Sequence, residues 1–97
     1  MLPEWARMID AEVKSTGVPA RTLALRSHEV VSKFRVLSPD LTGCSLTEST
    51  LSRLRRAGVA PRREKLIVLK LTCRSLEDSA WCCWSREQLQ AALLEAS

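Results

Sequence analysis

The sequence lacks most of the residues from which metal sites and catalytic motifs are built. It contains a single histidine, His28, and none of its four cysteines forms a Cys-x-x-Cys pair, so we expect no metal site. Its three glycines form no glycine-rich phosphate loop, and no nucleophile motif is present. His28, next to Glu29, is interpreted as a surface residue rather than a general base. The sequence therefore predicts no enzyme activity, no catalytic residue and no cofactor.

Long apolar runs are also missing. No stretch approaches the ~18 apolar residues of a membrane span, and no charged-then-apolar leader opens the chain, so we expect neither a membrane protein nor a secreted precursor. The cysteines are interpreted as small buried hydrophobes in a reducing compartment, the cytoplasm or the nucleus. Cys82 and Cys83 are adjacent on an expected strand and should therefore point to opposite faces.

The chain has the size and composition of one small globular domain. It has 97 residues and a mass of 10.9 kDa, with 45% hydrophobic and 27% charged residues, so we expect a single domain covering residues 1–97. Asn and Tyr are absent, whereas Leu, Ser and Arg together supply 37 of the 97 residues. Translation from a second reading frame could produce this composition, and so could an ordinary Arg- and Leu-rich protein.

Positive charge is concentrated in one segment. Residues 53–74 contain eight basic residues and one acidic residue, a net charge of +7, whereas residues 1–52 are neutral and residues 75–97 carry −3. A basic segment of this kind is typical of a surface that binds a polyanion, because phosphate contacts supply most non-specific affinity. A solvated basic face without a ligand is the alternative interpretation. The residues predicted to contact nucleic acid are Ser49, Ser52, Arg53, Arg55, Arg56, Arg62, Arg63, Lys65 and Arg74.

Apolar periodicity predicts two helices at the start of the chain and one at its end. The first covers about residues 3–15, with Gly17 after its end, and the second covers about residues 20–37. The final helix covers about residues 86–96 and opens with a capping box formed by Ser85 and Gln88.

A third helix is predicted between the second helix and the basic segment. Ser45 should cap the amide of Glu48 in a capping box, and Gly58 should end the helix, with Val59 folding back onto its last turn. Leu46, Thr50, Leu51, Leu54 and Ala57 would form its buried face.

Two strands are predicted after the third helix. Residues Lys65–Cys73 alternate in the manner of a strand, although Leu66, Leu69 and Cys73 also fit a helix. Residues Ala80–Trp84 are interpreted as a second, aromatic strand, so that the two form a hairpin. The expected fold class is therefore α+β, with three helices followed by a β-hairpin and a C-terminal helix.

This order of elements resembles the winged helix–turn–helix family. In that family the third helix enters the major groove of duplex DNA, and the hairpin, or wing, contacts the flanking backbone. The resemblance implies a recognition face formed by Ser49, Ser52, Arg53 and Arg56 and a wing contact from Arg74. The string Ser49–Arg53 also looks like the recognition helix of repressor-type domains. The expected function is a small regulatory protein that binds nucleic acid, as a homodimer.

The hairpin supports an alternative function. Leu66 and Val68 would cover one face of a strand whose other face is also apolar, and Trp81 and Trp84 would face opposite sides of the second strand. A second chain could cover the spare face. The protein would then be a homodimeric interaction module, of the kind found among viral or phage accessory factors, that binds a host or regulatory protein.

Overall fold

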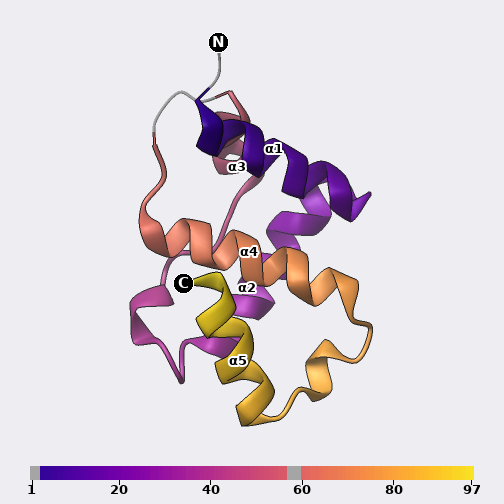
Figure 1. Ribbon diagram of the computed structural model, residues 1–97, viewed down its shortest axis with the longest axis vertical. Helices are drawn as coiled ribbons and strands as arrows, with labels where there is room; N and C mark the ends of the chain where they lie inside the picture. Colours follow the sequence, from indigo (N-terminus) through magenta and orange to yellow (C-terminus); the bar gives the residue numbers. More distant parts are fainter. Residues whose placement is uncertain (1–2, 57–59) are drawn as a thin grey trace.

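Helices supply the regular secondary structure in the computed structural model, which describes residues 3–56 and 60–97 (Figure 1). Two short 3-10 turns interrupt the connections between them. The elements in chain order are α1 (Glu4–Thr16), α2 (Ala20–Phe34), η1 (Pro39–Leu41), α3 (Glu48–Arg55), α4 (Arg63–Glu77), η2 (Trp81–Cys83) and α5 (Arg86–Ala96).

Helix α4 runs through the middle of the molecule and is the element around which the others pack. It contacts α1, α2, α5 and η1, and α3 packs on α1 and α2 at one end (Figure 1). A helix covered on several sides must be apolar around most of its circumference. The buried residues of α4 are Ile67, Val68, Leu69, Leu71, Thr72, Cys73 and Ser75.

The predicted α+β fold is wrong, because the segment Lys65–Cys73 lies within helix α4 and is not a strand. Residues 66–69 are all apolar, so the segment satisfies a period of two and a period of 3.6 at once. Burial by neighbours of the same chain explains why both of its expected strand faces are hydrophobic. No strand occurs in residues 3–56 and 60–97.

The second predicted strand, Ala80–Trp84, is wrong as well. Trp81–Cys83 form the 3-10 turn η2, and Asp78 holds this turn by accepting hydrogen bonds from the backbone amide of Ala80 (2.9 Å) and from the indole Nε1 of Trp84 (2.7 Å). These bonds lower the pKa of Asp78, the indole bond most. The connection between α4 and α5 is therefore a compact turn, and the predicted hairpin and wing do not exist.

The helices expected at the two ends of the chain are confirmed. Helix α1 ends at Thr16, and Gly17 follows it with φ of +67°, a conformation that favours glycine. Helix α2 starts at the expected residue but ends earlier, at Phe34, where the chain turns toward η1. Helix α5 opens with the predicted capping box, in which both the Ser85 and the Gln88 side chains make their bonds.

The predicted cap of the third helix is wrong by two residues. Thr47, not Ser45, precedes α3 in an extended conformation, and its hydroxyl accepts a hydrogen bond from the amide of Thr50 at 3.0 Å. Ser45 instead uses its carbonyl to accept a bond from the ammonium of Lys65 at 3.0 Å. The predicted end of this helix at Ala57, Gly58 and Val59 lies outside the described residues.

The cysteine prediction holds for two residues and fails for the other two. Cys44 and Cys73 are buried, as expected for small hydrophobic residues. Burial raises the pKa of Cys73 to about 12, and the charges of Glu12 and Glu77 act in the same direction. Cys82 and Cys83 are exposed, and their sulfurs lie 3.8 Å apart. The prediction that these two side chains point to opposite faces of a strand is therefore wrong.

Candidate functional site

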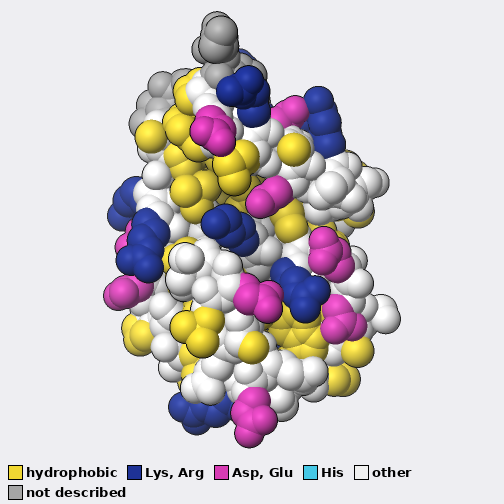
Figure 2. Space-filling view, in the orientation of Figure 1, with side chains coloured by type: hydrophobic (Ala, Val, Ile, Leu, Met, Phe, Trp, Pro, Cys, Tyr) yellow, Lys and Arg dark blue, Asp and Glu magenta, His cyan; other side chains and the backbone are white. Residues whose placement is uncertain are grey.

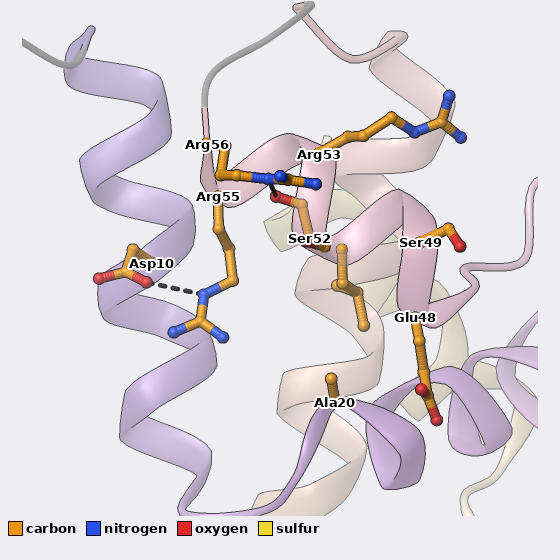
Figure 3. A pocket seen from close by; sticks show the side chains of 9 residues that line it. Asp10, Ala20, Glu48, Ser49, Ser52, Arg53, Arg55 and Arg56 are labelled. Atoms are coloured by element: carbon orange, nitrogen blue, oxygen red, sulfur yellow. Dashed lines mark hydrogen bonds and ion pairs between the residues drawn. The ribbon is translucent and has the colours of Figure 1, made fainter.

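Helix α3 presents two of the predicted arginines on its solvent-facing side. Leu51 and Leu54 are buried and anchor the other side of the helix to α1 and α2. Ser49, Ser52, Arg53 and Arg56 are exposed, so the face predicted from the sequence exists as a surface. Figure 3 shows the side chain of Arg53 extending away from the helix, whereas that of Arg56 lies back across the helix beside Ser52.

Arg55 does not belong to this exposed face. Its Nε donates to the carboxylate of Asp10 on α1 at 2.7 Å (Figure 3). Asp10 also accepts from Lys14, one turn further along α1, at 2.8 Å. These two bonds, that of Lys14 first, hold the pKa of Asp10 below its usual value. Arg55 therefore joins α3 to α1, and its charge is largely neutralised.

Two hollows flank Arg53 and define the candidate site. The larger has a volume of about 840 Å³ and is open to solvent. The smaller, of about 370 Å³, lies between α3 and the approach to α4. Arg53 lines both hollows and separates them. The larger is lined by Asp10, Ala20, Glu48, Ser49, Leu51, Ser52, Arg53, Arg55 and Arg56, and the smaller by Thr50, Arg53, Leu54, Ala60, Pro61, Arg62 and Lys65.

We call Arg53, Arg56 and Arg62 the arginine rim of these hollows. All three are exposed, and none makes an ion pair with a carboxylate in the part of the chain that the structure describes. The Nε of Arg56 donates to the carbonyl of Ser52, a residue of the same helix, at 3.4 Å. Lys65, half-buried, lies beside the rim, but its ammonium is engaged by the carbonyl of Ser45. The rim therefore offers three guanidinium groups to an anionic ligand.

Two predicted contact residues lie away from the arginine rim. Arg63 lines a separate hollow with Asp40 and Glu64. Arg74 sits in the last turn of α4, where its guanidinium lies 3.7 Å from Glu77, so the predicted wing contact of this residue is wrong. The basic segment is thus divided among different surfaces, because most of it winds around the central helix.

The predicted intersubunit residues are used within the chain. Val68 is fully buried in α4, and Trp81 is buried as well, so neither can meet a second chain without unfolding. Trp84 is half-buried and bonded to Asp78. Leu66 is half-buried and lines a groove of about 90 Å³ between α1 and α4. Of the four residues, Leu66 alone lies along a groove at the surface.

Two acidic residues shape the site in ways that the sequence does not predict. Asp10 removes Arg55 from the ligand-facing set, and Glu48 places a carboxylate at the edge of the larger hollow. The spacing of Asp10 and Lys14 on a helix signals their own pairing, but no local pattern signals the bond from Arg55, which is 45 residues away. The predicted capping box would instead turn the side chain of Glu48 toward the backbone.

Comparisons with protein-family models, with curated proteins and with solved structures found no match to this chain. Within residues 3–56 and 60–97, no group of three or more His, Cys, Asp or Glu side chains gathers in a way that could hold a metal ion. No helix in that same part of the chain is long and apolar enough to cross a membrane.

Proposed function

We propose that the protein binds duplex DNA through phosphate contacts made by Arg53, Arg56 and Arg62. The observation that carries the proposal is the arginine rim, in which three exposed guanidinium groups surround two hollows without carboxylate partners among the described residues. Guanidinium groups bind phosphate oxygens in a bidentate manner, and these contacts account for most of the affinity for a nucleic-acid backbone.

The side chains around the rim support this proposal. Ser49 and Ser52 are exposed on the same face of α3 and can donate to phosphate oxygens. Glu48 repels phosphate, so we expect the DNA backbone to lie over the three arginines and away from the edge of the larger hollow that Glu48 lines. The proposal requires neither a wing nor a hairpin, and it assigns no direction of regulation.

The test is a binding titration of a labelled, mixed-sequence duplex at two salt concentrations with the double variant Arg53→Ala, Arg56→Ala. Losing two charge-assisted contacts should cost on the order of 2–5 kcal/mol and reduce the slope of log affinity against log salt by about two. Both side chains are exposed, so the helical circular dichroism should not change.

A matched control is the double variant Arg35→Ala, Arg86→Ala, which removes the same charge. Arg35 follows α2 and Arg86 opens α5, and neither lines the two hollows. The end of α2 and the start of α5 lie in the lower half of Figure 1, away from α3. This variant should bind almost as tightly as the parent. Equal losses of affinity in both variants would show that net charge alone explains binding, which would overturn the proposal. The absence of binding by the parent at low salt would overturn it as well.

A second candidate function is self-association, favoured by the groove between α1 and α4. Trp5, Met8 and Leu66 line it, and Met8 is 54% exposed. Glu12 and Lys70 also line it, so a two-fold axis can set each of them opposite the other in a second copy. Light scattering should give twice the chain mass for the parent, and Met8→Glu should restore the monomer mass. A monomer mass for the parent at micromolar concentration would exclude this function.

A further inference from the structure

Two adjacent thiols are exposed on the connection between α4 and α5. The sulfurs of Cys82 and Cys83 lie 3.8 Å apart, in contact but not bonded. The remaining cysteines, Cys44 and Cys73, are buried. A reagent in solution therefore meets two thiols at one place on the native protein.

The turn that carries these thiols is fixed by its neighbours. Trp81, directly before Cys82, is buried, with the guanidinium of Arg26 at 5.0 Å and the ammonium of Lys33 at 5.3 Å from its ring centre. Lys33 also donates a hydrogen bond to the carbonyl of Cys82. The thiols are thus held side by side at the surface by a residue anchored in the core.

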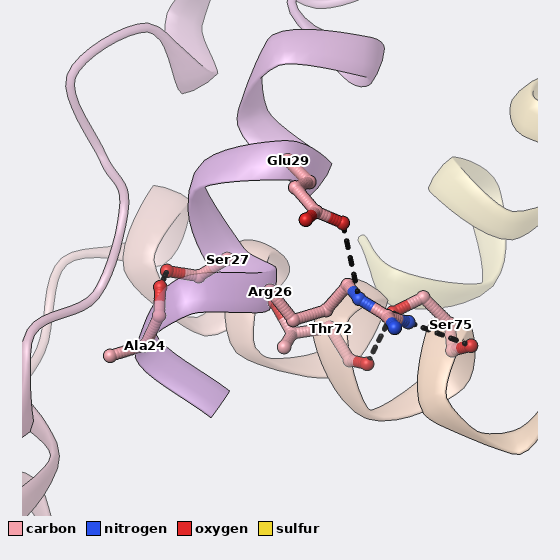
Figure 4. Close-up of polar contacts among 6 residues, drawn as sticks. All are labelled: Ala24, Arg26, Ser27, Glu29, Thr72 and Ser75. Atoms are coloured by element: carbon pink, nitrogen blue, oxygen red, sulfur yellow. Dashed lines mark hydrogen bonds and ion pairs between the residues drawn. The ribbon is translucent and has the colours of Figure 1, made fainter. Parts of the chain in front are cut away.

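Arg26 is itself held in place, which adds to the rigidity of the turn. Figure 4 shows its guanidinium between Glu29 on α2 and Ser75 on α4. The ion pair to Glu29 measures 3.3 Å, and the bonds to the hydroxyl and the carbonyl of Ser75 measure 3.3 Å each. The ring of Trp81 therefore packs against a cation that joins two helices.

We propose that Cys82 and Cys83 form a modification site at which a low-molecular-weight disulfide oxidises the two thiols to a disulfide between adjacent residues. The thiolate of one cysteine attacks a sulfur of the small disulfide, which forms a mixed disulfide and releases one small thiolate. The second cysteine, as its thiolate, attacks the protein sulfur of that mixed disulfide and releases the other small thiolate. The two thiol protons pass to the released thiolates, so one disulfide is consumed and one is formed.

The two sulfurs share one weak hydrogen bond, in which either thiol can be the donor. The hydrogen bond between the two sulfurs, together with the charge of Cys82, raises the pKa of Cys83, whereas the ammonium of Lys33 acts in the opposite direction. Whichever cysteine attacks first, the other sulfur lies 3.8 Å away and is placed to resolve the mixed disulfide.

The disulfide should be easily reduced. Consecutive Cα atoms across a trans peptide are about 3.8 Å apart, whereas disulfides usually join Cα atoms that are about 4.4–6.8 Å apart. A bond formed outside this range is strained, and strained exposed disulfides have the higher reduction potentials of regulatory bonds. The modification is therefore reversible by a small dithiol.

The test treats the native protein with oxidised glutathione and measures the tryptic peptide that covers residues 75–86, which contains both thiols but neither Cys44 nor Cys73. We expect this peptide to lose the mass of two hydrogen atoms and to regain it with dithiothreitol. Cys83→Ser cannot close the ring and should carry one stable glutathione on Cys82. Stable glutathione adducts on the parent peptide, disulfide-linked dimers, or an unmodified peptide would each overturn the proposal.

Discussion

Neighbouring arginines of α3 have different roles although each carries the same positive charge. Arg53 and Arg56 are three residues apart and exposed, as their helical spacing predicts, whereas Arg55 points the other way and pairs with Asp10. The spacing along a helix fixes which side chains share a face. It carries no information about a partner on another helix, so the role of Arg55 could not be predicted.

At the same scale, Ser27 is a polar residue in the core whose removal should be costly. It is fully buried on α2, where its hydroxyl donates to the carbonyl of Ala24 at 2.7 Å (Figure 4) and accepts from the amide of Leu46 at 2.8 Å. Ser27→Ala leaves that buried amide without a partner, which should lower the free energy of unfolding by about 1–3 kcal/mol. Urea denaturation measures the change.

Ser32, exposed on the same helix, provides the control for this measurement. Ser32→Ala should leave the free energy of unfolding within about 0.5 kcal/mol of the parent. Equal stability of the Ser27→Ala variant and the parent would show that the amide of Leu46 finds another partner.

At the scale of elements, the sequence predicts the helices whose apolar and polar residues follow a clear helical period and fails where a run of apolar residues hides that period. Helices α1 and α2 each have an apolar stripe and a polar side, so their period is visible and their positions are confirmed. Helix α4 has Lys70, Arg74 and Glu77 on an exposed side, but five of its six residues from Leu66 to Leu71 are apolar, which hides the contrast that distinguishes a strand from a helix. The predicted second strand, Ala80–Trp84, depended on the first, because a hairpin needs two strands. The predicted wing contact of Arg74 depended on that hairpin.

The start of α3 gives a direct test at this scale. Thr47→Ala removes the hydroxyl that caps the amide of Thr50, and loss of such a cap costs about 0.5–2 kcal/mol. Ser45→Ala keeps the carbonyl that Lys65 uses, so it should change stability little. Thermal or urea unfolding of the two variants compares them. A larger loss of stability in Ser45→Ala than in Thr47→Ala would show that Ser45, the residue expected from the sequence, caps the helix.

At the scale of the whole molecule, one hydrophobic core draws residues from every α-helix. The molecule measures 41 × 26 × 20 Å, and Figure 2 shows charged side chains of both signs distributed over the visible face, between apolar groups. The net charge of +7 in residues 53–74 is therefore not one surface, because α4 turns its basic residues toward different neighbours. The distribution of charge along the sequence indicates a basic surface within residues 53–74. The fold determines which of these arginines belong to the arginine rim.

The buried thiol of Cys73 reports on unfolding of this core. Cys73 is 8% exposed, and its raised pKa keeps it protonated and unreactive in the native state. In the variant Cys82→Ser, Cys83→Ser, alkylation of Cys73 should therefore follow the population of the unfolded protein and rise with urea in proportion to it. Mass spectrometry of the labelled protein measures the rate. Fast alkylation without urea would mean that α4 opens locally.

The central position of α4 also governs the order in which a growing chain can fold. When the ribosome has made α1, α2 and α3, those helices still lack the surface that covers their apolar faces, since α1 and α2 both pack on α4. Residues 63–77 must emerge before that surface exists, and α5, which also packs on α4, is made after them. During synthesis, more than half of the chain therefore remains exposed to chaperones and proteases until the fourth helix leaves the ribosome.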